Sequence, residues 1–229
     1  MIKHLACIMD GNRRWAQQKN LQPWYGHKEG VDAAFRVINF CLSRNIEYLS
    51  LFMFAIQNFK RSAQEINYIF DMFATNAQEV VAMFIKHDVR VQWIGDRSLF
   101  PESLQALCQE IEERTAHAQK LKLQLLFCYG GQEEIVAATK AIAQDVKAGI
   151  ITPDAISPDL FKTYLWSGAI IHPDLIIRTG KVHRLSNFLL YQAAYSELYF
   201  VDCLWPEISE DYLQQAVDYF NNCQRNFGI

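Results

Sequence analysis

The sequence predicts an α/β fold: a single domain with a central, mainly parallel, six-stranded sheet flanked by helices. Short apolar runs alternate along the chain with segments of helix length, which is typical of βαβ units. Most runs are apolar throughout, as expected for strands whose two faces are both covered by helices. The chain has 229 residues, of which 51% are hydrophobic, so it can bury one large core. We therefore expect one domain over residues 1–229.

The predicted elements follow one another in a regular order. Six apolar runs are predicted strands, at residues 5–9, 48–54, 89–94, 121–128, 175–177 and 198–201. Segments of helix length separate or follow them, at residues 26–44, 62–86, 99–121, 133–147 and 211–225. The second of these segments has apolar residues at helical spacing, so we expect a helix along it. Pro153 and Pro158 mark a surface loop before a short helix.

Composition and charge exclude several classes of protein. The formal net charge is −3 and no run of Lys and Arg forms a basic stripe, which argues against a nucleic-acid-binding protein. The six cysteines are scattered, form no CxxC pair and lie mostly in apolar stretches, where a free thiol is a small hydrophobic group. No signal peptide is evident, and no apolar run approaches the roughly 18 residues that span a bilayer. We expect a cytoplasmic protein without a membrane span.

The most informative segment lies where the first predicted strand ends. Asp10, Gly11 and Asn12 are followed by Arg13 and Arg14, which open a helix. At such a junction free N–H groups and the helix dipole favour an anion, and the arginines add positive charge. A carboxylate suits this place when a divalent cation bridges it to a phosphate. The segment therefore indicates a Mg²⁺-diphosphate site, or else an ordinary turn, because Asp-Gly-Asn is also common in turns.

A second anion site is predicted where the fifth strand ends. Arg178 is followed by Thr179 and Gly180, and Arg184 and Ser186 come shortly after. Arginine binds phosphate oxygens through paired donors, and a hydroxyl adds a further hydrogen bond. The alternative is that both arginines form surface ion pairs and that Ser186 caps a helix.

Further polar positions lie near the first and second strands. Asn58 and Arg61 are in the turn after the second strand, where polar groups can face a ligand. Glu65 fits a capping box with Ser62, which gives it a structural role. His27, at the start of a helix, suits either a phosphate site or a structural role.

Glu197 interrupts an apolar, aromatic run near the end of the chain. A carboxylate in such surroundings is rarely left unpaired. Metal coordination and an ion pair with an arginine would both satisfy it, and the sequence does not choose between them. The chain has no G-x-S-x-G elbow and no candidate Cys/His dyad, so hydrolases are disfavoured.

Taken together, these residues resemble the cis-prenyltransferase family over nearly the whole chain. The last of the matching segments is the most specific. In chain order they are His4…Met9-Asp10-Gly11-Asn12-x-Arg14-Trp15, Gly26-His27-x-x-Gly30, Phe54…Asn58-x-x-Arg61…Glu65, Ile94-Gly95-Asp96, Tyr129-Gly130-Gly131, Asp174…Arg178-Thr179-Gly180 and Arg184-Leu185-Ser186-Asn187-Phe188…Tyr195-Ser196-Glu197…Trp205-Pro206.

The resemblance implies a homodimeric enzyme with a parallel sheet and an elongated hydrophobic tunnel. Such an enzyme condenses isopentenyl diphosphate with an allylic diphosphate, such as farnesyl diphosphate, and uses Mg²⁺ as its cofactor. The product is a cis-polyprenyl diphosphate. Undecaprenyl diphosphate, a carrier-lipid precursor, is one expected product, and a shorter cis-prenyl chain is the alternative.

The same resemblance implies roles for individual residues. Asp10 and Asn58 are the expected catalytic positions, and Asp10 and Glu197 are the expected metal ligands. The loop after the first strand is expected to hold the allylic diphosphate, and the loop after the fifth strand the isopentenyl diphosphate. The implied substrate-binding positions are Gly11, Asn12, Arg13, Arg14, Trp15, His27, Phe59, Arg61, Arg178, Arg184, Leu185 and Ser186.

The chain also departs from the family pattern. Arg13 replaces a glycine, Pro23 stands where an arginine usually helps to hold diphosphate, and Phe59 replaces a tryptophan. Met53 stands where long-chain members carry an alanine, and its bulk predicts a product shorter than undecaprenyl diphosphate. The other departures are Ala55, Ile56, Gln57, Cys128, Gln132, Lys181 and Val182.

Two other classes of function are open on the sequence. A non-catalytic subunit would lend its arginine loop to a partner's active site, but members of that kind lose the Asp-Gly-Asn segment that is present here. A lipid-binding protein with the same tunnel fits the apolar substitutions, but it does not account for Asp10, Arg178 and Glu197.

Overall fold

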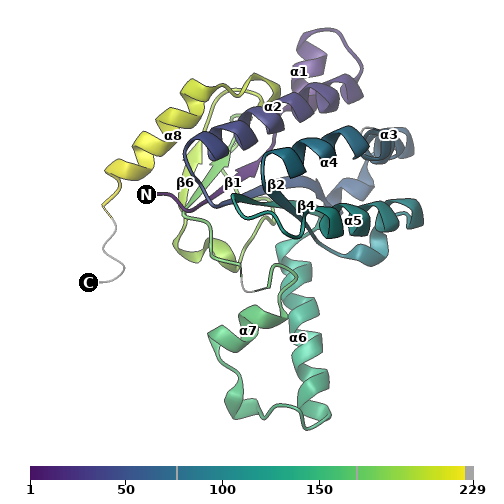
Figure 1. The fold of residues 1–229 in the computed structure, drawn as a ribbon, viewed down its shortest axis with the longest axis vertical. Helices are drawn as coiled ribbons and strands as arrows, with labels where there is room; N and C mark the ends of the chain where they lie inside the picture. Colours follow the sequence, from purple (N-terminus) through teal and green to yellow (C-terminus); the bar gives the residue numbers. More distant parts are fainter. Residues whose placement is uncertain (76, 169, 225–229) are drawn as a thin grey trace.

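The structure is a computed structural model that describes residues 1–75, 77–168 and 170–224. Its centre is one six-stranded sheet with the strand order β3-β4-β2-β1-β5-β6, and every neighbouring pair of strands is parallel. Figure 1 shows the strands at the centre of the molecule, with α2, α3, α4, α5 and α8 around them. The predicted α/β class and the six-stranded parallel sheet are confirmed.

Each strand begins and ends within one residue of its predicted bounds, because a run that is buried on both faces is apolar along its whole length. The strands are β1 His4–Ile8, β2 Tyr48–Ala55, β3 Val89–Ile94, β4 Leu121–Tyr129, β5 Leu175–Arg178 and β6 Glu197–Phe200. β1 pairs with β2 on one side and with β5 on the other, so Ile8 lies between Phe52 and Arg178. This register brings the loops after β1, β2 and β5 together at the carboxyl ends of the strands.

Helices connect the strands throughout the described part of the chain. They are α1 Asn12–Gln18, α2 Pro23–Ser43, α3 Ala63–Thr75, α4 Ala77–Lys86, α5 Glu102–Thr115, α6 Gly131–Lys147, α7 Pro158–Tyr164 and α8 Glu210–Asn222. Short 3₁₀ helices are found at Ile56–Lys60, Arg97–Leu99, Pro153–Ala155, Gln192–Tyr195 and Trp205–Glu207.

The bounds of the predicted helical segments differ from those in the structure, most clearly for segments 62–86 and 99–121. Segment 62–86 forms two helices, α3 and α4, and residue 76 lies outside the described residues. The helix predicted from residue 99 begins only at Glu102, because Pro101 disfavours helical backbone at the residue before it. The predicted end of the last helix, residue 225, also lies outside the described residues.

The main hydrophobic core lies on one face of the sheet. Side chains of five helices, α2, α3, α4, α5 and α8, pack there against alternate residues of the strands. The helix residues include Val37, Ile69, Phe84, Ile111 and Phe220. All five are nearly inaccessible to solvent, and burying such a side chain contributes about 1.5–3 kcal/mol. These helices therefore form one continuous layer over the sheet, and α2, α3, α4 and α5 also form walls of the apolar cavity described below.

The opposite face of the sheet is covered in a different way. Ala6, Ile8 and Leu126 pack there against Phe188 and Leu189, which belong to the segment between β5 and β6. The expectation that helices cover both faces therefore holds for one face, whereas a loop segment provides much of the cover on the other. In Figure 1, α6 and α7 extend away from the sheet and form a projection from the main body.

Five of the six cysteines are buried, as expected for thiols that act as small hydrophobic groups; they are Cys7, Cys41, Cys108, Cys128 and Cys203. Among the described residues, no helix has the length and apolar character needed to cross a bilayer.

A buried polar row crosses the sheet near the amino ends of the strands. The ring of His4 is hydrogen-bonded to the Ile171 carbonyl (2.7 Å) and to the Ser50 hydroxyl (2.8 Å). The Ser50 hydroxyl is also hydrogen-bonded to the side chain of Gln124 (2.5 Å). Burial lowers the pKa of His4 from 6.5 to about 4, because a charged imidazole loses its hydration there. His4 is therefore neutral in the folded protein at neutral pH.

The low pKa of His4 makes acid destabilisation a testable consequence. In the unfolded chain His4 gains a proton below pH 6.5, whereas in the folded protein it gains one only near pH 4. The contribution of neutral His4 to the free energy of unfolding should thus be complete above pH 6.5. It should fall by about 3 kcal/mol as the pH drops from 6.5 to 4. Urea unfolding at several pH values should show a shallower slope for His4→Gln. His87→Gln is the control, because His87 is exposed; an equal slope in His4→Gln and the parent would contradict this account.

Candidate active site

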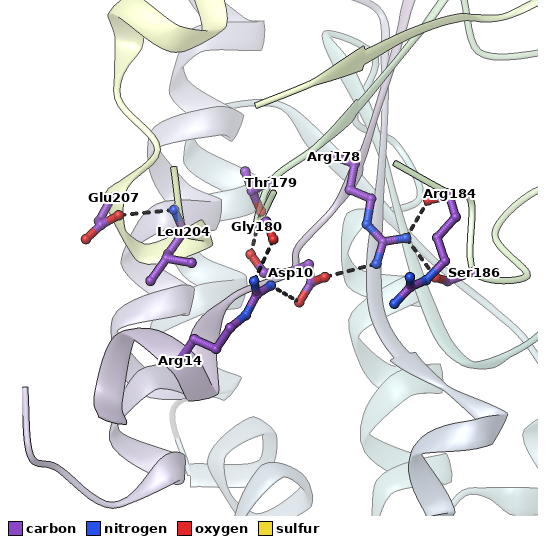
Figure 2. Close-up of polar contacts among 9 residues, drawn as sticks. All are labelled: Asp10, Arg14, Arg178, Thr179, Gly180, Arg184, Ser186, Leu204 and Glu207. Atoms are coloured by element: carbon purple, nitrogen blue, oxygen red, sulfur yellow. Dashed lines mark hydrogen bonds and ion pairs between the residues drawn. The ribbon is translucent and has the colours of Figure 1, made fainter. Parts of the chain in front are cut away.

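Asp10 lies at the centre of the polar site, just beyond the carboxyl end of β1. Its Oδ1 accepts a hydrogen bond from Arg14 Nη2 (3.0 Å), and its Oδ2 accepts one from Arg178 Nη2 (2.9 Å). The backbone carbonyl of Asp10 accepts a hydrogen bond from the Thr179 hydroxyl (2.7 Å). Figure 2 shows Arg14 and Arg178 approaching the carboxylate from opposite sides. One carboxylate therefore joins the two arginine loops that the sequence placed far apart.

The close packing of the two loops depends on Gly180. Its carbonyl accepts a hydrogen bond from Arg14 Nη1 (2.6 Å), and its φ is +90°. A Cβ at this position would lie 2.5 Å from Arg14 Nη2 and 3.1 Å from the carboxyl carbon of Asp10. A side chain here would therefore push Arg14 off Asp10, and the positive φ would strain it as well.

Arg178 also holds the loop that follows it. Its side chain is buried, and its Nη1 donates to the Ser186 hydroxyl (2.7 Å) and to the carbonyl of Arg184. Residues 184–190 are called the clamp loop below. Figure 2 shows the side chain of Arg184 beside that of Ser186, on the Arg178 side of Asp10. Arg184 itself is exposed, so its guanidinium is available to a ligand.

A second carboxylate, that of Glu65, balances the remaining cations. Glu65 Oε1 lies 3.1 Å from Arg61 Nη1 and 3.2 Å from His27 Nε2, and Oε2 lies 3.8 Å from Arg13 Nε. The hydrogen bond to His27, reinforced by the charges of Arg61 and Arg13, lowers the pKa of Glu65 although burial opposes this. Burial in turn lowers the pKa of Arg61, an effect that Glu65 opposes.

The capping box predicted for Glu65 is only half present. Its backbone N–H donates to the Ser62 hydroxyl (3.3 Å), but its side chain turns to the three cations instead. Glu65 is thus a site residue that sequence reasoning assigned to helix capping. The clue that it carried was its position four residues after Arg61, the spacing of an ion pair on one helix face.

Three cavities meet at this site. A polar one of about 600 Å³ is lined by residues including Asp10, Asn58, Arg178 and Ser186. A second polar one of about 380 Å³ is lined by Gly11, Arg13, Arg14, Arg61 and others. The third is apolar, measures about 150 Å³ and lies among α2, α3, α4, α5 and the sheet. Met9, Asn12 and His27 line all three.

Most of the predicted site residues come together at these cavities. Asn58 lines the larger polar cavity, where its side-chain oxygen accepts the Ala55 N–H (3.0 Å), so its amide nitrogen is the group that can face a ligand. The predicted site residues that line the polar cavities are Asp10, Gly11, Asn12, Arg13, Arg14, His27, Asn58, Arg61, Arg178 and Ser186.

Three predicted substrate-binding side chains have other surroundings in the described structure. Trp15 lies under the ammonium of Lys19, 4.9 Å from the ring centroid. Phe59 packs edge-on against Phe54 with a centroid distance of 5.1 Å, and 38% of its area stays exposed. Leu185 packs against the hydrophobic residues on the face of the sheet that Phe188 and Leu189 cover.

Glu197 lies at the amino ends of the strands, whereas Asp10 lies beyond their carboxyl ends. It is the first residue of β6 and pairs with Leu175, the first residue of β5, whereas Asp10 follows the end of β1 beside Arg178. The three residue steps from Leu175 to Arg178 correspond to about 10 Å. A single chain therefore does not bring Glu197 to Asp10 as a pair of metal ligands.

A magnesium ion fits the site with Asp10 as its protein ligand. Mg²⁺ is commonly held by one or two carboxylates together with the phosphates of a substrate, and Asp10 stands between two groups of phosphate-binding cations. Within the described residues there is no cluster of three or more His, Cys, Asp or Glu side chains that would hold a metal alone.

Replacing Glu65 tests how far it stabilises the cation cluster. Glu65→Gln should lower the free energy of unfolding by on the order of 1.5–3 kcal/mol at pH 7, since it loses buried bonds between charged groups. The Glu65 pKa is lowered from 4.5 in the folded state, so the contribution is complete above pH 4.5 and is lost as the pH falls through the folded value. Urea unfolding at pH 7 and at lower pH measures both effects.

The control for this variant is Asp159→Asn, which removes an exposed ion pair with Lys162 and should leave stability almost unchanged. A Glu65→Gln protein as stable as the parent at pH 7 would show that the cations do not depend on this carboxylate.

The comparisons with known proteins agree over the whole chain. A prenyltransferase family model described as "Putative undecaprenyl diphosphate synthase" matches residues 8–228. The ditrans,polycis-undecaprenyl-diphosphate synthase ((2E,6E)-farnesyl-diphosphate specific) of Pseudomonas syringae pv. tomato is 42% identical over 226 residues, which are 99% of this chain and 90% of that protein. The enzyme of the same name from Xylella fastidiosa is 40% identical over 227 residues, or 99% and 89% of the two chains.

Two solved structures are similar along their full length. Lavandulyl diphosphate synthase from Lavandula x intermedia, in complex with dimethylallyl diphosphate, has a TM-score of 0.96 and 31% identity, covering 100% of this chain and 98% of that one. A probable undecaprenyl diphosphate synthase from Campylobacter jejuni has a TM-score of 0.82 and 31% identity, covering 100% and 99%. The resemblance found in the sequence is confirmed, and this chain belongs to the cis-prenyltransferase family.

Proposed function

We propose that this protein is a Mg²⁺-dependent cis-prenyltransferase that condenses isopentenyl diphosphate with an allylic diphosphate and releases diphosphate. The observation that carries the proposal is that two polar cavities, both lined by Asp10 and by arginines, meet one apolar cavity at Met9, Asn12 and His27. Two diphosphates need two sets of cations, and a prenyl tail needs an apolar space beside them. The names of the full-length relatives support the same reaction.

The smaller polar cavity suits the allylic diphosphate. Arg13, Arg14, Arg61 and His27 line it, and the first residues of α1 begin at its wall. Ionising an allylic C–O bond leaves negative charge on the departing diphosphate, which fixed cations stabilise without reorganisation. Mg²⁺ bound through Asp10 would add a double positive charge to the same leaving group. The tail would extend from there past Met9 and Asn12 into the apolar cavity.

The clamp loop suits isopentenyl diphosphate. Ser186 and Arg178 line the larger polar cavity, and the exposed guanidinium of Arg184 lies beside them in Figure 2. These groups would fix the diphosphate end, so that the double bond of isopentenyl diphosphate lies over the allylic carbon. Holding two reactants in this way lowers the barrier by removing their relative motion. The Asn58 amide nitrogen is a further donor for a diphosphate in this cavity.

A homodimer and a cytoplasmic location complete the proposal. β6 is an edge strand whose residues are only half-buried, and Val136 and Ile171 add exposed apolar surface with 51% and 38% of their area accessible. A second copy of the chain would cover such surface. Buried thiols suit a reducing compartment.

The test of the proposed reaction is incubation of the purified protein with labelled isopentenyl diphosphate, farnesyl diphosphate and Mg²⁺. Labelled prenyl product should form, and it should be lost with EDTA or in Asp10→Ala. Because Asp10→Ala also frees Arg14 and Arg178 from their carboxylate, binding of inorganic diphosphate should persist, which separates lost turnover from lost folding. Asp154→Asn, an exposed site, is the matched control. Undiminished product in EDTA or in Asp10→Ala would refute the metal role of Asp10.

A shorter product than undecaprenyl diphosphate is the second candidate, and the size of the apolar cavity favours it. A cavity of about 150 Å³ takes a ligand about as large as benzene, or roughly one five-carbon unit. Met53 lines this cavity together with Phe73, Phe84 and Trp93, and a close-packed wall of this kind resists expansion. Of the two structural relatives, the lavandulyl diphosphate synthase superposes more closely than the probable undecaprenyl diphosphate synthase.

Product analysis of Met53→Ala tests the length assignment. Removing the bulk of Met53 should lengthen the apolar cavity and shift the products toward chains longer by one or more five-carbon units. Chromatography of dephosphorylated products gives the distribution. Met83→Ala is the control, since Met83 packs against the same core but is not part of the cavity lining. Full-length chains from the parent, or unchanged products from Met53→Ala, would show that Met53 does not limit length.

A further inference from the structure

The first turn of α6 is tied to the clamp loop through a single residue, Asn187. The N–H of Gly131 donates to the Asn187 carbonyl (2.8 Å), and the N–H of Gln132 donates to Asn187 Oδ1 (2.8 Å). Asn187 Nδ2 donates to Glu133 Oε2 (2.7 Å). Helix N-termini need acceptors for their first N–H groups, and here a residue distant in the sequence supplies them. Asn187 thus acts as a cap delivered by tertiary contact.

The Tyr129-Gly130-Gly131 segment makes room for this contact. A Cβ on Gly130 would lie 2.1 Å from Glu133 Oε2 and 2.7 Å from Asn187 Nδ2, and one on Gly131 would lie 2.8 Å from Leu190 Cγ. Side chains at these two positions would therefore push the clamp loop off α6. Nothing in the proposed chemistry uses these glycines, so the seating of the clamp loop accounts for them.

The next residue of α6, Glu134, anchors the chain just beyond the clamp loop. Its Oε2 accepts hydrogen bonds from Gln192 Nε2 (2.9 Å) and from the Tyr129 hydroxyl (2.6 Å). Consecutive acidic residues in the first turn of α6 therefore hold Asn187 and Gln192. The hydrogen bond from Asn187 to Glu133 and the one from Gln192 to Glu134 fix the path of the chain before and after Phe188 and Leu189. These two residues cover the second face of the sheet.

The clamp loop has a backbone that needs such support. Ser186, Asn187 and Leu189 have φ values of +51°, +68° and +39°. Left-handed backbone is unfavourable for most residues other than glycine and persists only where surrounding contacts enforce it. On the inner side Arg178 contacts Ser186 and Arg184, and on the outer side Asn187 contacts α6. The two groups proposed to grip isopentenyl diphosphate thus lie between two fixed points.

We propose that Asn187 is a positioning residue for the isopentenyl diphosphate half of the site, acting with Glu133 as its partner. The inference rests on the proposed function of the clamp loop. By capping α6, Asn187 holds Ser186 and Arg184 in the geometry that binds diphosphate, and Asn187 itself also lines the larger polar cavity. Glu133 Oε1 also accepts a hydrogen bond from Gln57 Nε2 (3.1 Å), so the same carboxylate links the clamp loop to the 3₁₀ helix after β2.

A pair of exchange variants tests this role. Asn187→Asp keeps the acceptor for Gln132 and tolerates left-handed backbone, but it places a carboxylate against Glu133. Isopentenyl diphosphate should then bind about tenfold or more weakly, while farnesyl diphosphate, titrated separately, should bind within about twofold of the parent. Adding Glu133→Gln supplies an amide donor to the new carboxylate and should restore affinity to within about threefold. Glu133→Gln alone should be near the parent, because the introduced amide and the amide of Gln57 can orient to match.

Calorimetric titration of each diphosphate alone measures these affinities without turnover, so the result does not depend on catalysis. Ser157→Ala, which removes the cap of α7, is the matched control and should lower stability without changing either affinity. Parallel weakening of both ligands in Asn187→Asp, or absence of rescue in the double variant, would overturn the positioning role. A parent that condenses the substrates while Asn187→Asp binds isopentenyl diphosphate normally refutes this inference alone. A parent that binds neither diphosphate refutes the proposed function as well.

Discussion

The ion pairs of Asp10 with Arg14 and Arg178 are the interaction on which the rest of the site depends. They join the loop after β1 to the loop after β5, and the parallel pairing of those two strands brings the loops within reach. Arg178 is buried, with 4% of its area accessible, and a buried guanidinium without a carboxylate would be strongly unfavourable. The same carboxylate thus stabilises the fold at this edge and reserves the position where a metal would bridge to diphosphate.

Charge balance explains how so many cations can lie together. Arg13, His27 and Arg61 surround Glu65, while Arg14 and Arg178 surround Asp10. Two carboxylates therefore serve four arginines and one histidine, and the arginines alone leave an excess of positive charge facing the polar cavities. A diphosphate compensates that excess when it binds. Of the departures from the family pattern, Arg13 adds to this excess at the cavity wall, whereas Pro23 begins α2, a position that suits its fixed φ.

Much of the fold and part of the site could be read from the sequence. Strands were predictable because burial on both faces makes them apolar throughout. The loops after β1 and β5 were predictable as anion sites because Asp10, Arg14 and Arg178 are chemically unusual at strand ends. The sequence did not show at which end of its strand a side chain lies, or which distant side chains it contacts. Asp10 and Glu197 were both expected to be metal ligands, but Glu197 starts its strand and therefore lies at the amino ends of the strands, whereas Asp10 lies beyond their carboxyl ends. Glu65 was assigned to a cap, because the sequence does not show that Arg13 and His27 converge on it together with Arg61.

The wall that the three cavities share has a consequence for how such enzymes diversify. Met9, Asn12 and His27 border all three cavities at once, so under the proposed function a substitution at any of them would disturb both diphosphate sites and the tail site. Residues deeper in the apolar cavity, such as Phe84 and Leu107, border the tail alone. Evolution can therefore change chain length by exchanging deep wall residues while the chemistry at the entrance stays intact. Variation among relatives should accordingly be concentrated at the far end of the cavity.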